Sequence, residues 1–208
     1  MRGPGFVVPV QGPFRLAAVA VSHGWFQTAP FTWDADAELL HRTEDLGDGT
    51  VQLVVGASDG GVGVAPSRRL SAAEVALARS RVRRMLQLDA ELDGFPEAVA
   101  AVDPGLARDL AEYGGGRVLA GASLFEDVVK GICGTNTTWR QAVASINRVA
   151  GLGAGDAFPS PADLLRAGET PLREVARVGY RAPALLAAAR AAIDGTLADI
   201  EADSAAGD

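Results

Sequence analysis

The 208-residue sequence contains little cysteine, little lysine and no long apolar run. Its single cysteine, Cys133, excludes an internal disulfide, and no cysteine or histidine cluster has metal-ligand spacing, so no metal is expected. The absence of a run of about eighteen apolar residues excludes a membrane span, and the N-terminal residues lack the apolar region of a signal peptide. These absences predict a globular protein of the cytoplasm.

The distribution of charge is uneven along the chain. A net charge of −7 argues against a protein that simply coats phosphates, because such binding depends on an excess of cations. Residues 123–193 nevertheless hold eight basic and six acidic residues. The last eight residues, 201–208, contain no basic group and predict a flexible acidic tail. Lys130 is the only lysine, and its position in the middle of an expected helix predicts a solvated side chain.

The pattern of apolar residues changes character near residue 70. Residues 14–65 alternate apolar and polar groups in short runs separated by glycine-rich turns, which is typical of antiparallel strands. From Ser71, which can form a capping box with Glu74, apolar residues recur at helical spacing. The sequence therefore predicts an α+β fold with an antiparallel β lobe at 1–70 and a helical domain at 71–200, packed together.

One helix in this second part is expected to be largely buried. Ser123 can cap it, and Leu124, Val128 and Ile132 line one of its faces. Gly134 is a natural left-handed end for this helix.

Polar groups occupy two turns between expected helices. Asn136 lies in the first turn, before a helix that Thr138 and Gln141 can cap. In the second turn, Tyr180 and Arg181 follow a glycine and precede a proline suited to the first turn of a helix. Asparagine in such a turn is also a common local capping residue, and an exposed tyrosine and arginine can be ordinary surface residues.

The two turns resemble those of a known family. The Ile-Cys-x-x-Asn and Gly-Tyr-Arg-Ala segments, in this order after an antiparallel β lobe, are similar to the helix-hairpin-helix (HhH-GPD) superfamily of DNA glycosylases, in the 8-oxoguanine and 3-methyladenine branch. The resemblance runs from about Phe14 to Ala192. It implies base-excision repair: a damaged purine, oxidised or alkylated, is flipped out of duplex DNA and its N-glycosidic bond is hydrolysed without a cofactor. Damaged double-stranded DNA would be the partner, and the protein would then associate with the nucleoid.

The resemblance also assigns residues to this recognition. Asn136, Tyr180 and Arg181 would enter the gap left by the flipped base and contact the orphaned partner base. The position of a further DNA-contacting arginine of the family corresponds to Gln141 in this chain. Arg140 lies next to it and is the candidate for that contact.

In the β lobe, a family glycine that touches the flipped base matches Gly24, with His23 and Trp25 beside it as lining of a base pocket. His23 is equally compatible with a residue satisfied by the backbone, and Cys133 with a small buried hydrophobic group.

The family's catalytic groups have no match. In the family a Leu-Pro-Gly-Val-Gly hairpin follows the helix equivalent to residues 183–193, and an aspartate and, in some members, a lysine come after it. The expectation is that this chain corresponds to the first two-thirds of a glycosylase, with no catalytic residue assigned. Two alternatives stay open: an inactive or fragmentary DNA-binding protein of the same family, and a module for a small molecule or a protein with only architectural resemblance.

Overall fold

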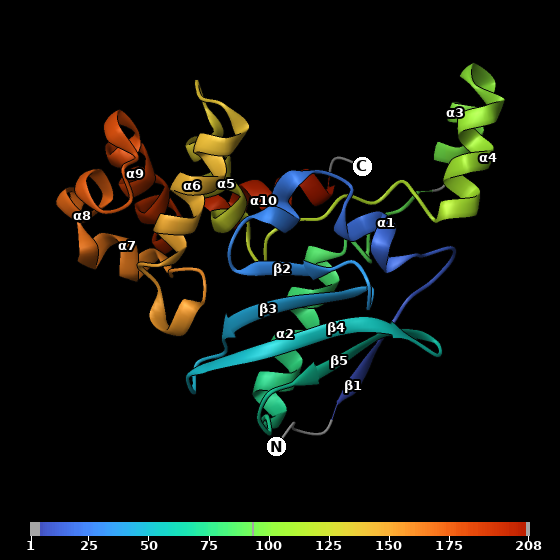
Figure 1. The fold of residues 1–208 in the computed structure, drawn as a ribbon, viewed down its shortest axis with the longest axis horizontal. Coiled ribbons are helices and arrows are strands. Elements are labelled where there is room, and N and C mark those ends of the chain that lie inside the picture. Colours follow the sequence, from blue (N-terminus) through green and yellow to red (C-terminus); the bar gives the residue numbers. More distant parts are fainter. Residues whose placement is uncertain (1–4, 93, 207–208) are drawn as a thin grey trace. The chain divides into compact units, whose positions relative to one another are not determined.

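The protein is an α+β structure with one antiparallel sheet and a series of helices, as the sequence predicts (Figure 1). The computed structural model describes residues 5–92 and 94–206. It divides into two compact units: the first holds residues up to 27, Phe31–Arg42 and Leu46–Ala120, and the second holds Thr28–Pro30, Thr43–Asp45 and the residues from 121 onward. The expected boundary at residue 70 falls inside the first unit.

The sheet has the strand order β1-β5-β4-β3-β2, and the pairs β1–β5, β4–β5 and β2–β3 are antiparallel. Alternate residues of β4 and β5, among them Leu53, Val55 and Val64, are buried on one face, which is the two-residue period expected of a half-buried strand. The strands are β1 (Phe6–Pro9), β2 (Phe31–Asp34), β3 (Leu39–Asp45), β4 (Thr50–Ser58) and β5 (Gly61–Pro66).

The prediction of a strand at the start of the 14–65 region is wrong. These residues form α1 (Leu16–Ala20), followed by the short 3-10 helix η1 (Gly24–Gln27). The buried residues of α1 are Leu16, Val19 and Ala20, and their i, i+3, i+4 spacing places them on one helical face. The actual first strand, β1, lies earlier in the chain and pairs with β5 at the sheet edge.

Three further helices belong to the first unit. The predicted capping box of Ser71 and Glu74 is confirmed and starts α2 (Ala72–Met85), which packs against β1. Arg68 adds an ion pair to Glu74 at 2.5 Å. The helices α3 (Phe95–Val102) and α4 (Pro104–Tyr113) pack against each other.

The second unit is helical and has its own apolar core, formed by residues such as Val129, Ile146, Leu172 and Leu185. Its α9 packs against α5, α7, α8 and α10. Its elements are α5 (Leu124–Gly134), α6 (Trp139–Ala150), η2 (Ala154–Asp156), α7 (Pro161–Ala167), α8 (Glu169–Glu174), η3 (Gly179–Arg181), α9 (Ala182–Ile193) and α10 (Thr196–Ala206). Residues 201–206 of the expected acidic tail are thus helical, and 207–208 lie outside the described residues.

The buried face of α5 differs from the expected one. Phe125, Val129 and Cys133 are fully buried, whereas the expected residues Leu124, Val128 and Ile132 are only partly buried. Because α5 is covered by α6, α9 and α10, its buried surface is wider than a single apolar stripe.

Lys130, expected to be solvated, is only 1% exposed. Its ammonium group pairs with the carboxylate of Glu126, also 1% exposed, at 2.8 Å. The ammonium also lies 5.8 Å from the ring centre of Phe158. The expectation failed because Glu126, one helical turn earlier, provides the countercharge that a buried lysine requires.

Candidate nucleic-acid interface

The first turn reverses the chain between α5 and α6 at Asn136. Gly134 was expected to be the left-handed residue, but α5 ends there and Thr135 continues in an extended conformation. The left-handed residue is Asn136, with a φ of 50°. Asparagine tolerates this region better than most residues, so the turn itself favours asparagine here. The Asn136 side chain is exposed.

The start of α6 follows the expected capping pattern. The Gln141 side chain accepts hydrogen bonds from the Thr138 amide at 3.3 Å and the Thr137 hydroxyl at 2.9 Å, and Thr138 in turn caps the Gln141 amide. Gln141 is therefore engaged in the cap. Arg140 beside it is exposed and makes no ion pair with any residue among those that the structure describes.

The second turn runs from the end of α8 to the start of α9. The sequence suggests Gly179 as a helix end, but α8 ends at Glu174 and Gly179 is the first residue of η3. Its φ of 62° is a conformation that glycine adopts easily. Pro183 lies in the first turn of α9, as expected, where its missing N–H costs no hydrogen bond. Gly179, Tyr180 and Arg181 together form η3.

Arg181 joins the two turns, although 45 or more residues separate it from the first turn in sequence. Its guanidinium donates to the Thr135 carbonyl and lies within 3.3 Å of the Thr135 hydroxyl and 3.4 Å of the Asn136 carbonyl. It also reaches the Val178 carbonyl, in its own turn, at 3.4 Å. A planar guanidinium with five donors suits such a set of acceptors. Two separate connections thus form one surface within the second unit.

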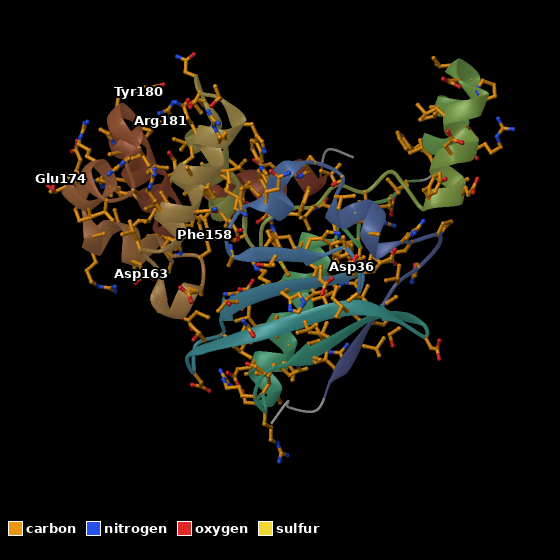
Figure 2. All side chains as sticks on the ribbon, in the orientation of Figure 1. Asp36, Phe158, Asp163, Glu174, Tyr180 and Arg181 are labelled. Carbon is orange, nitrogen blue, oxygen red and sulfur yellow. The ribbon has the colours of Figure 1, made fainter. Side chains whose placement is uncertain are left out.

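Tyr180 projects from this surface. Its side chain is 64% exposed, and the Arg181 guanidinium carbon lies 4.6 Å from the centre of its ring. Figure 2 labels the two side chains beside each other near the start of α9. An exposed aromatic ring backed by a cation is suited to stacking on another planar group.

Cys133, three residues before Asn136, is a packing residue. It is 1% exposed, and burial raises the pKa of its thiol to about 11, against the opposing effect of Arg181. A thiol with so high a pKa stays protonated and is a poor nucleophile. The two turns therefore contain no reactive cysteine.

The base-pocket candidates His23, Gly24 and Trp25 lie in the first unit, around the start of η1. The two ring nitrogens of His23 are both engaged: Nε2 donates to the Leu119 carbonyl at 2.7 Å, and Nδ1 accepts from the Trp25 amide at 3.3 Å. The His23 and Trp25 rings also meet edge to face, with centroids 5.0 Å apart. His23 thus holds Trp25 in place.

The first unit also contains a cavity of about 750 Å³. Its lining is mixed, with charged groups beside apolar ones, among them Arg83, Asp89, Phe95, Leu110 and Arg117. His23, Gly24 and Trp25 are not among its lining residues, so this cavity is separate from the candidate base pocket.

Comparison with known proteins supports the fold. No family model and no curated protein sequence matches this chain. Among solved structures, the 3-methyladenine DNA-glycosylase from Archaeoglobus fulgidus matches with a TM-score of 0.66 and 16% sequence identity. The match covers 89% of this chain and 66% of the glycosylase chain, slightly less than two-thirds of its length. The protein therefore has a DNA-glycosylase-like fold.

Two general features accompany this fold. Within residues 5–92 and 94–206, no helix is long and apolar enough to cross a membrane. In the same part of the chain, no group of three or more histidine, cysteine, aspartate or glutamate side chains is placed to hold a metal ion.

Proposed function

We propose that the protein recognises damaged purines, oxidised or alkylated, in duplex DNA as part of base-excision repair, using the surface formed by the two turns. The observation that carries this proposal is the Arg181 bridge, which places the exposed Tyr180 and the turn of Asn136 on one surface. The glycosylase-like fold supports the same function.

Flipping a base leaves a gap in the duplex and an unpaired partner base, at a cost of a few kcal/mol. The Tyr180 ring enters the gap and stacks on a neighbouring base, which offsets part of that cost. The Asn136 amide offers one donor group and one acceptor to the orphaned base. Arg140, at the start of α6, supplies positive charge for the backbone.

The flipped base itself is proposed to meet the segment His23–Trp25. With both nitrogens of His23 engaged, the indole face of Trp25 and the backbone of Gly24 are the groups that contact it. Hydrolysis of the N-glycosidic bond would follow through an oxocarbenium-like sugar. We assign no residue of this chain to that step, so recognition and base release are tested separately.

The binding test uses fluorescein-labelled duplexes that carry a tetrahydrofuran abasic analogue, and identical intact duplexes, measured by fluorescence anisotropy. The wild-type protein should bind the abasic duplex more tightly. Stacking contributes about 1–3 kcal/mol per base, so Tyr180→Ala should weaken that binding roughly 5- to 150-fold. The matched control is Tyr113→Ala, which removes the chain's other tyrosine, also exposed but in the first unit.

Equal affinity for abasic and intact duplexes, or an unchanged Tyr180→Ala variant, would refute recognition at these turns. The second test incubates the protein with duplexes that contain 8-oxoguanine or an alkylated adenine and measures release of the base. Binding without release would favour the alternative of a noncatalytic DNA-binding protein.

A further inference from the structure

Arg177, three residues before Tyr180, holds an unfavourable backbone conformation. Its φ is 56°, in the left-handed region that glycine and asparagine occupy more easily than arginine does. A long side chain at such a position costs stability relative to glycine. Strained residues of this kind concentrate at functional sites.

The turn explains why the conformation is needed but not why the residue is arginine. Ala176 and Val178 are fully buried on either side of Arg177. The left-handed residue between them lets the Val178 amide turn back and donate to the Leu172 carbonyl at 3.1 Å. Glycine at position 177 would give the same path with less strain.

The Arg177 side chain points to solvent and not into the apolar core. It is exposed, and it makes no hydrogen bond or ion pair with any residue in the described ranges 5–92 and 94–206. On the preceding helix α8, Glu169 is paired with Arg173 at 2.6 Å. A strained and exposed cation therefore lies two residues before Gly179 and three residues before Tyr180 in the sequence.

We propose that Arg177 is a positioning residue that binds a backbone phosphate of DNA when Tyr180 enters the duplex. The inference rests on the proposed function, because it takes Tyr180 as the residue at the gap. Arg177 can lie at most about 11 Å from Tyr180 along the chain. The DNA backbone carries one charge per roughly 1.7 Å of helix axis, so phosphates surround any inserted residue at that distance.

The test compares Arg177→Gly and Arg177→Lys with wild type, using the labelled abasic duplex between 50 and 200 mM salt. Loss of one phosphate contact lowers the slope of log affinity against log salt by about 0.9. The ratio of the affinities at 50 and 200 mM should therefore fall roughly 3.5-fold in Arg177→Gly. Arg177→Lys keeps the charge and should retain the wild-type slope.

Stability measurements separate this role from a structural one. Because it relieves strain, Arg177→Gly should melt higher than wild type, by about 2–4 °C, while binding DNA less tightly. A purely structural residue would not yield a more stable protein that binds worse. The matched control is Arg190→Ala on α9, an exposed arginine nine residues beyond Arg181, which should leave the salt slope unchanged.

The possible failures are distinguishable. A wild-type protein that does not prefer the abasic duplex refutes the proposed function. A wild-type protein that does prefer it, with an unchanged salt slope in Arg177→Gly, refutes the role of Arg177 alone.

Discussion

Replacing Arg181 with alanine should separate the two turns. The substitution removes the side-chain donors that reach the Thr135 carbonyl and hydroxyl and the Asn136 carbonyl, whereas the Val178 carbonyl still accepts from the backbone amide of residue 181. These contacts join segments that are distant in sequence, and local structure does not replace them. The expected result is a less stable second unit in which Asn136 is mobile relative to Tyr180.

The size of the effect follows from the contacts. A typical hydrogen bond contributes about 0.5–1.5 kcal/mol net, and bonds to charged groups contribute more. Several of the Arg181 contacts are long, at 3.3–3.4 Å, and the acceptors in the first turn become accessible to water after the substitution. We therefore expect a loss of about 2–3 kcal/mol, which corresponds to about 4–12 °C in melting temperature for a protein of this size.

The assay is thermal unfolding followed by circular dichroism, together with amide proton exchange in the first turn. Arg181→Lys should be intermediate, because one ammonium group cannot reach several acceptors as the guanidinium does. Tyr180→Ala, at an exposed position, should leave the melting temperature unchanged although it weakens DNA binding. An Arg181→Ala protein with wild-type melting and wild-type amide exchange at Asn136 and Thr137 would contradict the bridge.

Three other predictions concern stability and reactivity. Lys130→Met leaves the Glu126 carboxylate buried without its partner and should cost about 3–5 kcal/mol in unfolding free energy, whereas the double variant Lys130→Met/Glu126→Gln should recover much of it in urea denaturation. Hydrogen bonding to Arg68 lowers the pKa of Glu74 from 4.5 to about 2, so the stability that the Glu74 carboxylate confers is present above pH about 5 and is lost as the pH falls toward 2. The difference in stability between wild type and Glu74→Gln should therefore shrink over this range, and a difference that is independent of pH would contradict the assignment. Cys133, whose thiol pKa is raised to about 11, should resist iodoacetamide at pH 8 in the folded protein and react after unfolding, as mass spectrometry can show.

Local signals in the sequence predicted the local parts of this structure. The capping boxes at Ser71 and Thr138 and the first-turn proline Pro183 of α9 depend on residues within a few positions of one another, and all three are present. The segment around Leu16 was mistaken for a strand because a short apolar run fits both periods. The left-handed position was placed at Gly134 instead of Asn136 because either residue is a natural end for a helix.

The parts that the sequence did not predict depend on contacts between distant segments. The burial of Lys130 requires α6, α9 and α10 to cover α5 on several sides, and no local pattern specifies this. The contacts of Arg181 are of the same kind, since its acceptors lie 45 or more residues away. The sequence motifs predict which residues form the candidate site, and the structure shows which contacts Arg181 makes.

The contacts of Arg181 have a consequence for the proposed recognition of DNA. In the proposed function, the Arg181 Nη2 protons that reach the Thr135 and Asn136 carbonyls are not available to an orphaned base while the bridge is closed. Turning these donors to DNA would remove the link between the first turn and the turn of Tyr180. In the proposed function, the Asn136 amide, which both donates and accepts hydrogen bonds, is therefore the main contact of the orphaned base. Under this proposal, the protein should bind duplexes with different bases opposite an abasic site with similar affinity, and all of them more tightly than intact duplex.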